Sequence, residues 1–430
     1  MYSKLPPGYI TKSSIVCIGG GLVAYTGIEY FSGSETFYRK GVINFLIISM
    51  KYLITLIIQL MPAVHRFVEP EQSHKIAVKM AKWGLMPKFG YNLKEYPELK
   101  TEVLGRTVEN PIGLAAGFDK NGEAIYQLAT SSGFGMVEIG SVTPLPQPGN
   151  QRPRVFRLLE DEGVVNRYGF NSDGVGKVQQ RVKEAWEKLV EKRKEAENSN
   201  RRNMAIFGVN LGKNKLAEDA KLDYEIGVNY FAKYCDYLVV NISSPNTPGL
   251  RSLQSKKELQ NLMQYIKHDV DRHGLSPSPK LVLKIAPDLI DSEISDIAQV
   301  ALDKKYGIDA LIISNTTISR PESLKSDLKN EVGGLSGQPL KDLSTECIRR
   351  MYRLTKGQVP IIGCGGVANG EDAYAKIRAG ASAVQLYTAL VYDGFPVVGK
   401  VKRELAELIR KDGYSNISEV VGSDHKDLKK

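Results

Sequence analysis

Short apolar runs alternate with longer amphipathic segments from Pro111 onward. Apolar runs of three to five residues are typical of buried strands, and their alternation with helical segments is typical of βα units. The runs are Ile112–Ala115, Met136–Ile139, Ile206–Val209, Leu238–Val240, Leu281–Ile285, Ala310–Ile313, Val359–Ile362 and Ala383–Leu386. Eight such strands predict an α/β protein with a closed (β/α)8 barrel, the TIM barrel, and a doubly wound open sheet is the alternative.

Polar or glycine residues follow each of these runs. They are Ala116 to Lys120, Gly140 and Ser141, Asn210 to Lys213, Asn241 to Gly249, Lys284 and Pro287, Ser314 to Thr317, Gly363 to Gly366, and Tyr387 and Thr388. Because (β/α)8 barrels carry their sites at the carboxyl ends of the strands, this distribution predicts a functional site at that end.

The segment after the fourth run is the densest in hydrogen-bonding side chains. Asn241, Ser244, Asn246 and Thr247 lie within seven residues, and two intervening or flanking prolines restrict the backbone that carries them. A restricted backbone suits a preorganised binding site. A turn built on an Asn or Ser side chain explains any one of these residues equally well.

Glycines after the seventh run suggest an anion site. Gly363, Gly365 and Gly366, together with Tyr387 and Thr388 after the eighth run, suit a phosphate held by backbone N–H groups. A tight strand-to-helix turn explains the same glycines. The Gly-x-Gly-x-x-Gly pattern of a Rossmann nicotinamide site does not follow the first run.

The amino-terminal region carries two long apolar stretches. Ser13–Ile28 is uncharged, which predicts a transmembrane anchor, with a targeting signal as the alternative. Val42–Met61 contains one charged residue, Lys51, so it either spans the membrane or lies in the interface.

A short amphipathic helix is expected next. It begins near Glu69, carries Ile76, Met80 and Trp83 on one face, and ends near Gly84. Its apolar face meets either lipid or the main domain, and packing against the core is the simpler interpretation. We therefore divide the chain into an anchor region at 1–40, a membrane-associated helical region at 41–90 and a barrel domain at 91–430.

Composition restricts the classes of partner. With 42% hydrophobic and 25% charged residues, the 430-residue chain is expected to be globular. Its net charge of +10 is spread over scattered lysines and arginines without an aromatic-plus-basic cluster, so no nucleic acid partner is expected. Four cysteines, Cys17, Cys235, Cys347 and Cys364, lie far apart, which predicts neither a metal site nor a disulfide framework.

Four motifs together resemble one enzyme family. They are Ala115 to Lys120, Asn166 to Phe170, Asn241 to Gly249, and Ser314 to Thr317. The chain resembles the membrane-bound, quinone-dependent dihydroorotate dehydrogenases from about residue 60 to about residue 410. The resemblance implies FMN-dependent oxidation of dihydroorotate to orotate in pyrimidine biosynthesis, with ubiquinone as the electron acceptor. We infer no obligate protein partner.

The resemblance also implies roles for individual residues. Ser244 matches the catalytic base, with Thr247 and Phe170 on the proton relay, and a serine instead of a cysteine indicates the membrane-bound class. The residues expected to bind substrate are Lys120, Asn166, Arg167, Tyr168, Gly169, Phe170, Asn241, Asn246, Asn315 and Thr316. Asparagine amides offer the donors and acceptors that a pyrimidine ring requires. Turn asparagines explain one or two of them, and a surface salt bridge is the alternative for Lys120.

A further set of positions matches the FMN site. These are Ala115, Ala116, Gly117, Phe118, Asp119, Ser141, Asn210, Asn241, Lys284, Ser314, Ser336, Gly337, Gly365, Gly366, Tyr387 and Thr388. Lys284 suits the negative charge of a reduced flavin. A flexible glycine loop is the alternative for Ser336 and Gly337.

The family implies a quinone tunnel beneath two amino-terminal helices. His74, Arg157 and Tyr387 match tunnel positions, although Arg157 can instead pair with Glu160 or Asp161. The implied location is the mitochondrial inner membrane, in contact with its lipid and with the catalytic domain facing the intermembrane space. That topology is met if Ser13–Phe31 spans and Val42–Met61 lies in the interface. The stretch Val42–Leu60 departs from the family pattern.

Two rival functions remain open at this stage. One is an FMN barrel enzyme that delivers electrons to fumarate or NAD, against which the apolar amino terminus and the lack of a cysteine cluster argue. The other is a membrane-tethered binding or scaffold protein that has lost catalysis. The intact Ser244, Lys284 and asparagine set argues against that second reading.

Overall fold

The computed structural model describes residue 61 and residues 64–85, 93–198 and 204–428. The expected span at Ser13–Phe31 and all of Val42–Met61 except its last residue lie outside these ranges. Within the described ranges, we find no helix with the length and apolarity that a membrane crossing demands.

Eight parallel strands close into a barrel. In chain order they are β3 (Ile112–Leu114), β4 (Met136–Val142), β7 (Ile206–Leu211), β8 (Tyr237–Asn241), β9 (Lys280–Ile285), β10 (Ala310–Ile313), β12 (Ile361–Cys364) and β13 (Ala383–Leu386). β13 pairs with β3 and completes the circle. The predicted (β/α)8 barrel is confirmed, and the open-sheet alternative is wrong.

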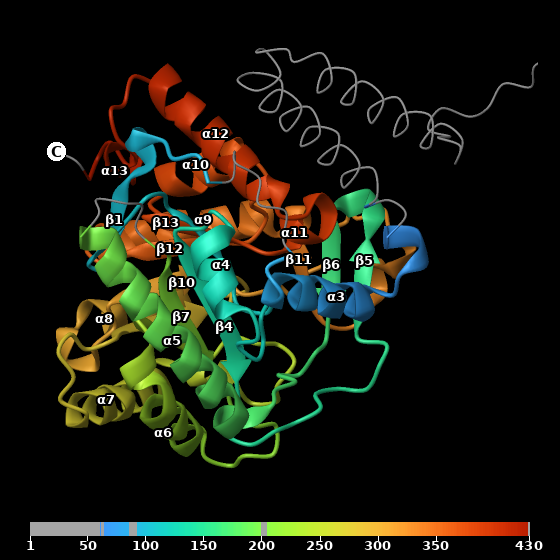
Figure 1. Cartoon of the computed structure of the whole chain (residues 1–430), viewed down its shortest axis with the longest axis vertical. Helices are drawn as coiled ribbons and strands as arrows, with labels where there is room; N and C mark the ends of the chain where they lie inside the picture. The colour runs from blue at the N-terminus through green and yellow to red at the C-terminus, as the bar shows by residue number, and fades with distance from the viewer. Residues whose placement is uncertain (1–60, 62–63, 86–92, 199–203, 429–430) are drawn as a thin grey trace, which may run out of the picture. The chain divides into compact units, whose positions relative to one another are not determined.

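Helices cover the outside of the barrel (Figure 1). They are α4 (Ile125–Ser131), α5 (Gly174–Asn198), α6 (Ala220–Phe231), α7 (Lys256–Arg272), α8 (Asp291–Leu302), α9 (Lys341–Thr355), α10 (Gly370–Arg378), α11 (Thr388–Asp393), α12 (Pro396–Lys411) and α13 (Ile417–Val420). Neighbouring helices pack against one another around the ring, for example α6 against α7 and α8 against α9.

Alternate residues of the strands separate into two apolar cores, as a two-residue side-chain period requires. Met136, Val239 and Ile312 belong to the small interior cluster, whereas Val137 and Val240 belong to the large cluster beneath the helices. A hairpin that the sequence did not predict, β1 (Thr101–Val103) and β2 (Arg106–Val108), adds valines to the interior cluster. Both faces of the strands are therefore buried, which explains their continuous apolar runs.

A second, antiparallel sheet stands beside the barrel and was also not predicted. It contains β5 (Val155–Leu158), β6 (Gly163–Asn166) and β11 (Gly334–Gly337), in the order β11-β6-β5. Ser336 pairs with Val164 in this sheet. The alternative of a flexible glycine loop around Ser336 is therefore wrong, because the segment is a strand.

The amphipathic helix α3 (Pro70–Lys82) forms where the sequence predicts it. The Glu69 carboxylate accepts hydrogen bonds from the backbone N–H groups at the start of the helix, 2.9 and 2.8 Å away. Val78 and Ala81 face the domain, and α3 lies against α4 and β5. Ile76, Met80 and Trp83 instead remain 51%, 41% and 66% exposed. The interpretation that these three residues pack in the core is wrong.

Candidate functional site

Amide and ammonium groups meet where four neighbouring barrel strands end. Asn210 lies on β7, Asn241 ends β8, Lys284 lies on β9, and Asn315 follows β10. Asn241 is paired with Lys284 in the β8–β9 register. Parallel strands present their carboxyl ends at one end of a barrel, so side chains distant in sequence come together there.

A continuous hydrogen-bond chain joins the three asparagines. Nδ2 of Asn241 lies 3.2 Å from Oδ1 of Asn210 and 3.0 Å from Oγ of Ser141. Nδ2 of Asn315 lies 3.3 Å from Oδ1 of Asn241, and Oδ1 of Asn315 accepts from the Thr316 N–H at 2.7 Å. Because every link has a donor and an acceptor, each amide has one orientation. The structure thus brings these five predicted residues together.

Ser244 lies in the loop that follows β8. It is 6% exposed, and its Oγ accepts the backbone N–H of Asn246 at 3.3 Å. Thr247 is 5% exposed. Within the described part of the chain, no hydrogen bond joins the two hydroxyl groups. Their roles as base and relay therefore stay predictions.

Arg251 holds this loop in place, and sequence reasoning missed it. Its Nε donates to the Ser243 carbonyl and its Nη2 to the Thr316 carbonyl, both at 3.1 Å. Its Nη1 lies 2.9 Å from Oδ2 of Asp288. One guanidinium thus joins the loops after β8 and β10. Arg251 begins a short 3-10 helix, Arg251–Gln254, and a lone arginine there carries no sequence signal for such a role.

Lys120 is partly buried and forms no ion pair within the described ranges. Its Nζ lies 4.2 Å from the centre of the Tyr168 ring. Burial, reinforced by the nearby Arg154 charge, lowers the pKa of Lys120 to about 8. The expected alternative of a surface salt bridge is wrong, because the Lys120 ammonium lies over the Tyr168 ring and pairs with no described carboxylate.

The residues from Asn166 to Phe170 have mixed surroundings. Asn246 donates through Nδ2 to the Asn166 carbonyl at 3.3 Å. The Arg167 side chain has protein partners of its own. Its Nη1 lies 2.7 Å from Oε2 of Glu331, and its guanidinium lies over the Phe156 ring. A direct contact between Arg167 and substrate stays a prediction.

Gly169 and Phe170 both have positive φ angles, 69° and 52°. A Cβ on Gly169 would lie 2.7 Å from the side chain of Asn150, so a larger residue does not fit there. A phenylalanine in the left-handed region is uncommon and is often found at functional sites. The ring of Phe170 lies over Gly212, between the loops that follow β6 and β7.

The loop after β3 supplies backbone to the site and side chains to the scaffold. The Gly117 N–H donates to the Gly140 carbonyl at 2.9 Å, beside Ala115 and Ala116. Asp119 is fully buried, and its carboxylate caps the N–H groups of Glu123 and Ala124, each at 2.8 Å. Burial raises the pKa of Asp119 to about 6. Its side chain is engaged by this cap.

A cradle for an anionic group lies between the ends of β11, β12 and β13. The backbone N–H groups of Gly365 and Gly366 donate to no acceptor within the described residues. Gly366 has φ 73°, and a Cβ there would lie 2.5 Å from Cβ of Lys341. Oγ1 of Thr388 lies 2.9 Å from Oγ of Ser336, next to Gly337. Free N–H groups and hydroxyls of this kind suit a phosphate.

Lys284 faces the barrel interior and is 5% exposed. Its ammonium group forms no hydrogen bond or ion pair with the described residues, whereas buried charges normally have partners. A planar group with negative charge at this position would supply the missing acceptor. Ser314, on the neighbouring strand end, donates through Oγ to the Asn315 carbonyl at 2.9 Å.

A second cluster lies between α3 and the barrel. Nε2 of His74 lies 2.6 Å from the Phe118 carbonyl oxygen and 3.5 Å from the Tyr387 hydroxyl, and Nδ1 lies 3.3 Å from the Tyr168 hydroxyl. The ring of Phe395 packs edge-on against Phe118. Burial and the charge of the nearby Lys120 lower the pKa of His74 to about 4, and burial raises that of Tyr387. Both groups are therefore neutral at physiological pH.

Arg157, on β5, joins that strand to α3 and to the segment before it. Its Nη1 donates to the carbonyls of Val68 at 2.9 Å and His65 at 3.3 Å, and its Nη2 donates to Ser73. The expected alternative, a pair with Glu160 or Asp161, is not formed. Sequence reasoning missed His65, whose Nε2 lies 2.8 Å from the Val391 carbonyl oxygen.

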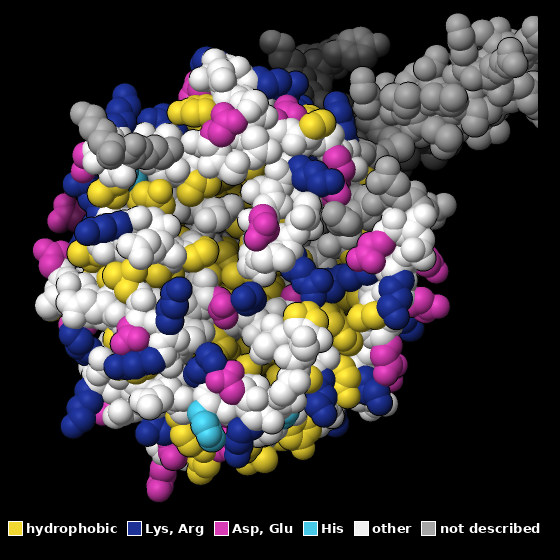
Figure 2. Space-filling model, turned by 90° about the vertical axis from the view of Figure 1, so that its left-hand side faces the viewer, with side chains coloured by type: hydrophobic (Ala, Val, Ile, Leu, Met, Phe, Trp, Pro, Cys, Tyr) yellow, Lys and Arg dark blue, Asp and Glu magenta, His cyan; other side chains and the backbone are white. Residues whose placement is uncertain are grey.

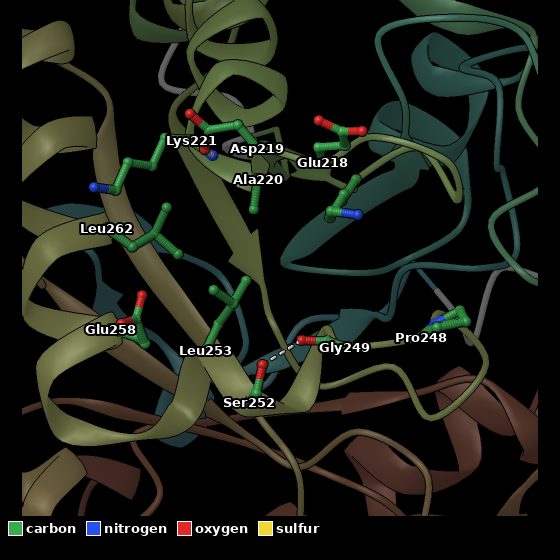
Figure 3. Close-up of a pocket in the computed structure, with 11 residues that line it drawn as sticks. Glu218, Asp219, Ala220, Lys221, Pro248, Gly249, Ser252, Leu253, Glu258 and Leu262 are labelled. Atoms are coloured by element: carbon green, nitrogen blue, oxygen red, sulfur yellow. Dashed lines mark hydrogen bonds between the residues drawn. The ribbon is translucent and has the colours of Figure 1, made fainter.

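A surface pocket of about 350 Å³ lies outside this site (Figure 3). The start of α6 and the segment from Pro248 to Leu262 line it, and Ser252 donates to the Gly249 carbonyl at its edge, 2.6 Å away. It contains none of the predicted substrate or cofactor residues. Figure 2 shows Lys and Arg interspersed with Asp and Glu on the face that it draws, so the described residues in that view form no continuous basic stripe.

The fold and the site define a (β/α)8-barrel enzyme with an amide-rich binding site at the carboxyl ends of its strands. Residues 98–409 match the family model described as dihydroorotate dehydrogenase. The chain belongs to the dihydroorotate dehydrogenase family, and the predicted family is confirmed.

Individual relatives agree with this assignment. The chain is 46% identical over 414 residues to mitochondrial dihydroorotate dehydrogenase (quinone) of Mus musculus, covering 96% of both chains. It is 47% identical over 366 residues to dihydroorotate dehydrogenase (quinone) of Rhodospirillum rubrum, covering 84% of this chain and 93% of the relative. The crystal structure of the Eimeria tenella enzyme in complex with ferulenol superposes with a TM-score of 0.77 at 43% identity, covering 84% of this chain and 97% of that one.

Proposed function

We propose that this protein oxidises dihydroorotate to orotate and passes the electrons to a quinone, as a step of pyrimidine biosynthesis. The observation that carries the proposal is the meeting of Asn241, Asn315, Lys120 and Ser244 at one end of the barrel, in a member of this family. Quinone appears in the names of both bacterial and mitochondrial relatives. A flavin is the family's cofactor.

The polar groups match the substrate in number and kind. A dihydropyrimidine ring presents alternating N–H and C=O groups, and the amides of Asn166, Asn241, Asn246 and Asn315 supply both complements. Lys120 supplies a cation for the substrate carboxylate. Arg167, Tyr168, Gly169 and Thr316 complete the proposed substrate-binding set with Phe170.

Ser244 is the proposed base that takes the proton from ring carbon 5. A serine hydroxyl is a weak base at neutral pH, so it needs a path that removes its own proton. Thr247 is the proposed next carrier, and Phe170 shields the path from solvent. The low exposure of both hydroxyls supports this assignment because bulk water does not compete at the reacting carbon.

FMN is the proposed form of the flavin, because the site has room for a phosphate at one end and a charge partner at the other. Gly365, Gly366, Ser336, Gly337 and Thr388 would hold the phosphate. Lys284, Asn210, Ser141 and Ser314 would hold the ring system, with the backbone from Ala115 to Asp119. A bound flavin would supply the hydride acceptor for ring carbon 6 and the electron carrier to quinone.

Quinone is proposed to reach the flavin beneath α3. His74, Tyr387 and Arg157 supply polar groups at the boundary between α3 and the barrel, beside the aromatic rings of Phe118 and Phe395. Because His74 and Tyr387 are both neutral, they suit an uncharged quinone headgroup. We propose ubiquinone as the acceptor.

The exposed face of α3 supports contact with lipid. Ile76, Met80 and Trp83 are apolar and lie beside Lys79 and Lys82 on a helix, a composition that suits a membrane interface. Names of relatives from mouse, rice and Arabidopsis support a mitochondrial location. We propose the inner membrane, with Ser13–Phe31 as its span and the catalytic domain facing the intermembrane space. Cleavage of the barrel by protease in intact mitoplasts is the expected result, and full protection would contradict this topology.

The direct test uses the full chain purified in detergent. The protein should carry FMN, lose its yellow colour on anaerobic addition of dihydroorotate, and regain it with ubiquinone but not with fumarate or NAD. Ser244→Ala should bind orotate and reduce its flavin at least about a hundredfold more slowly. Flavin reduction at the wild-type rate would remove Ser244 as the base, and a colourless wild-type protein would overturn the proposed function.

A further inference from the structure

Glu138 places a carboxylate inside the barrel. It lies at the middle of β4 and is fully buried between Val137 and Ile139 along the strand. Its Oε1 accepts from Nδ2 of Asn210 at 2.9 Å, and its Oε2 accepts from Nε2 of Gln385 at 2.7 Å. No Lys, Arg or His forms an ion pair with it within the described ranges.

Packing does not account for this residue. A buried carboxylate without a cation carries a desolvation cost that no opposite charge offsets. The interior cluster nearby contains apolar residues such as Met136 on the same strand and Val239 on β8, and the polar Gln385 on β13 is the second partner of the carboxylate. A costly buried charge whose partner Asn210 belongs to the site points to a role in that site.

The orientation of Asn210 depends on Glu138. A carboxylate accepts hydrogen bonds, so the neighbouring amide turns its NH2 group toward it. The opposite atom, Oδ1, then faces the site, where Ser141 donates to it and Nδ2 of Asn241 lies 3.2 Å away. The other asparagines have backbone anchors: Oδ1 of Asn241 accepts the Ser243 N–H and Oδ1 of Asn315 accepts the Thr316 N–H.

We propose that Glu138 is a positioning residue for the flavin and substrate site. It holds the Asn210 amide with its oxygen toward Ser141 and Asn241, and it acts through Asn210 without touching either ligand. This inference rests on the ligand-binding roles proposed above for Asn210 and Asn241. Loss of the carboxylate leaves two buried amide donors unsatisfied, so a variant that disturbs the same carboxylate without changing Asn210 is needed to separate stability from ligand binding.

The test compares Glu138→Met with Gln385→Met in the full-length protein. Gln385 donates to the same Glu138 carboxylate but forms no hydrogen bond with the asparagines among the described residues. Gln385→Met is therefore a matched control for disturbance of the interior. Glu138→Met leaves the buried Asn210 and Gln385 amides without their acceptor, so it should melt below the wild type; it should also retain less flavin through purification and bind orotate about tenfold or more weakly, as followed by flavin absorbance. Gln385→Met should bind orotate as the wild type does.

A conservative variant provides a second measurement. Glu138→Gln keeps the acceptor for Asn210 but replaces a charge-assisted bond by a neutral one, so orotate should bind about threefold more weakly. Wild-type orotate affinity in Glu138→Gln or Glu138→Met, or an equal loss in Gln385→Met, would overturn the positioning role. Absence of any orotate-dependent flavin change in the wild type would overturn the proposed function itself, which distinguishes the two failures.

Discussion

The Nε2 atom of His74 lies 2.6 Å from the carbonyl oxygen of Phe118. This contact joins α3 to the loop after the first barrel strand, across 44 residues of sequence. The same imidazole lies 3.5 Å from the Tyr387 hydroxyl. His74, a residue of α3, therefore links the helix over the proposed quinone path to two segments of the proposed flavin site, the loop after β3 and the end of β13.

Replacing His74 should change how stability depends on pH. Its pKa is about 4 in the folded protein and near 6.5 when unfolded, so the folded state binds fewer protons between these values. Its contribution is fully present above pH 6.5 and is lost as the pH falls toward 4, by about 3 kcal/mol in total. Urea unfolding at pH 7 and pH 5 should show a smaller loss in His74→Gln than in the wild type. Equal losses would contradict the buried, neutral imidazole.

Orotate affinity should fall at alkaline pH through Lys120. Burial lowers the pKa of Lys120 to about 8, so the ammonium group is charged below that pH and increasingly neutral above it. A carboxylate ligand binds the charged form, and its dissociation constant should rise about tenfold from pH 7 to pH 9. Lys120→Arg keeps the charge throughout and should give a flat profile. A flat wild-type profile would show that Lys120 does not meet the carboxylate.

Arg157→Met should weaken quinone use and spare the first half of the reaction. The substitution removes hydrogen bonds to the carbonyls of Val68 and His65 and to Ser73, which hold the segment before α3. The KM for a short-chain ubiquinone should rise about tenfold. Anaerobic flavin reduction by dihydroorotate should keep its wild-type rate. A slower reduction with an unchanged quinone KM would place Arg157 at the substrate instead.

Glu71 should govern the docking of α3. Its buried carboxylate accepts from Arg152 at 3.0 and 2.7 Å and from Arg154 at 2.9 and 2.8 Å. Burial alone would raise the pKa of Glu71, but these two arginines lower it to about 2. Its contribution is therefore present above pH 4.5 and is lost as the pH falls toward 2.

Glu71→Gln should accelerate hydrogen exchange across α3 and leave exchange in the barrel strands unchanged, because a buried ion pair loses one partner. Arg152→Gln is the matched control. The Arg152 side chain is 61% exposed, so it should have a much smaller effect. Unchanged exchange in α3 of Glu71→Gln would show that apolar contacts alone hold the helix.

The predicted strands rested on local patterns that tertiary structure rarely overrides. Ala310–Ile313 and Ala383–Leu386 appear with their predicted bounds, because a strand buried on both faces needs a continuous apolar run. The seventh begins two residues later than expected, at Ile361, after Pro360, which lacks an N–H group for the sheet. The small sheet with β11 escaped notice because Gly334–Gly337 has the composition of a loop and finds its partner, β6, more than 160 residues earlier.

By itself, the sequence determined the eight strands, the polar caps at their ends, the helix at Pro70 and the family, since all of these depend on residues close together in the chain or on whole motifs. Only the tertiary structure decided which face of α3 is exposed, where Arg157 and Arg167 point, and that Glu138 lies beneath Asn210. Those outcomes depend on which distant atoms come within hydrogen-bond distance. Barrel closure sets these distances, and no local pattern records them.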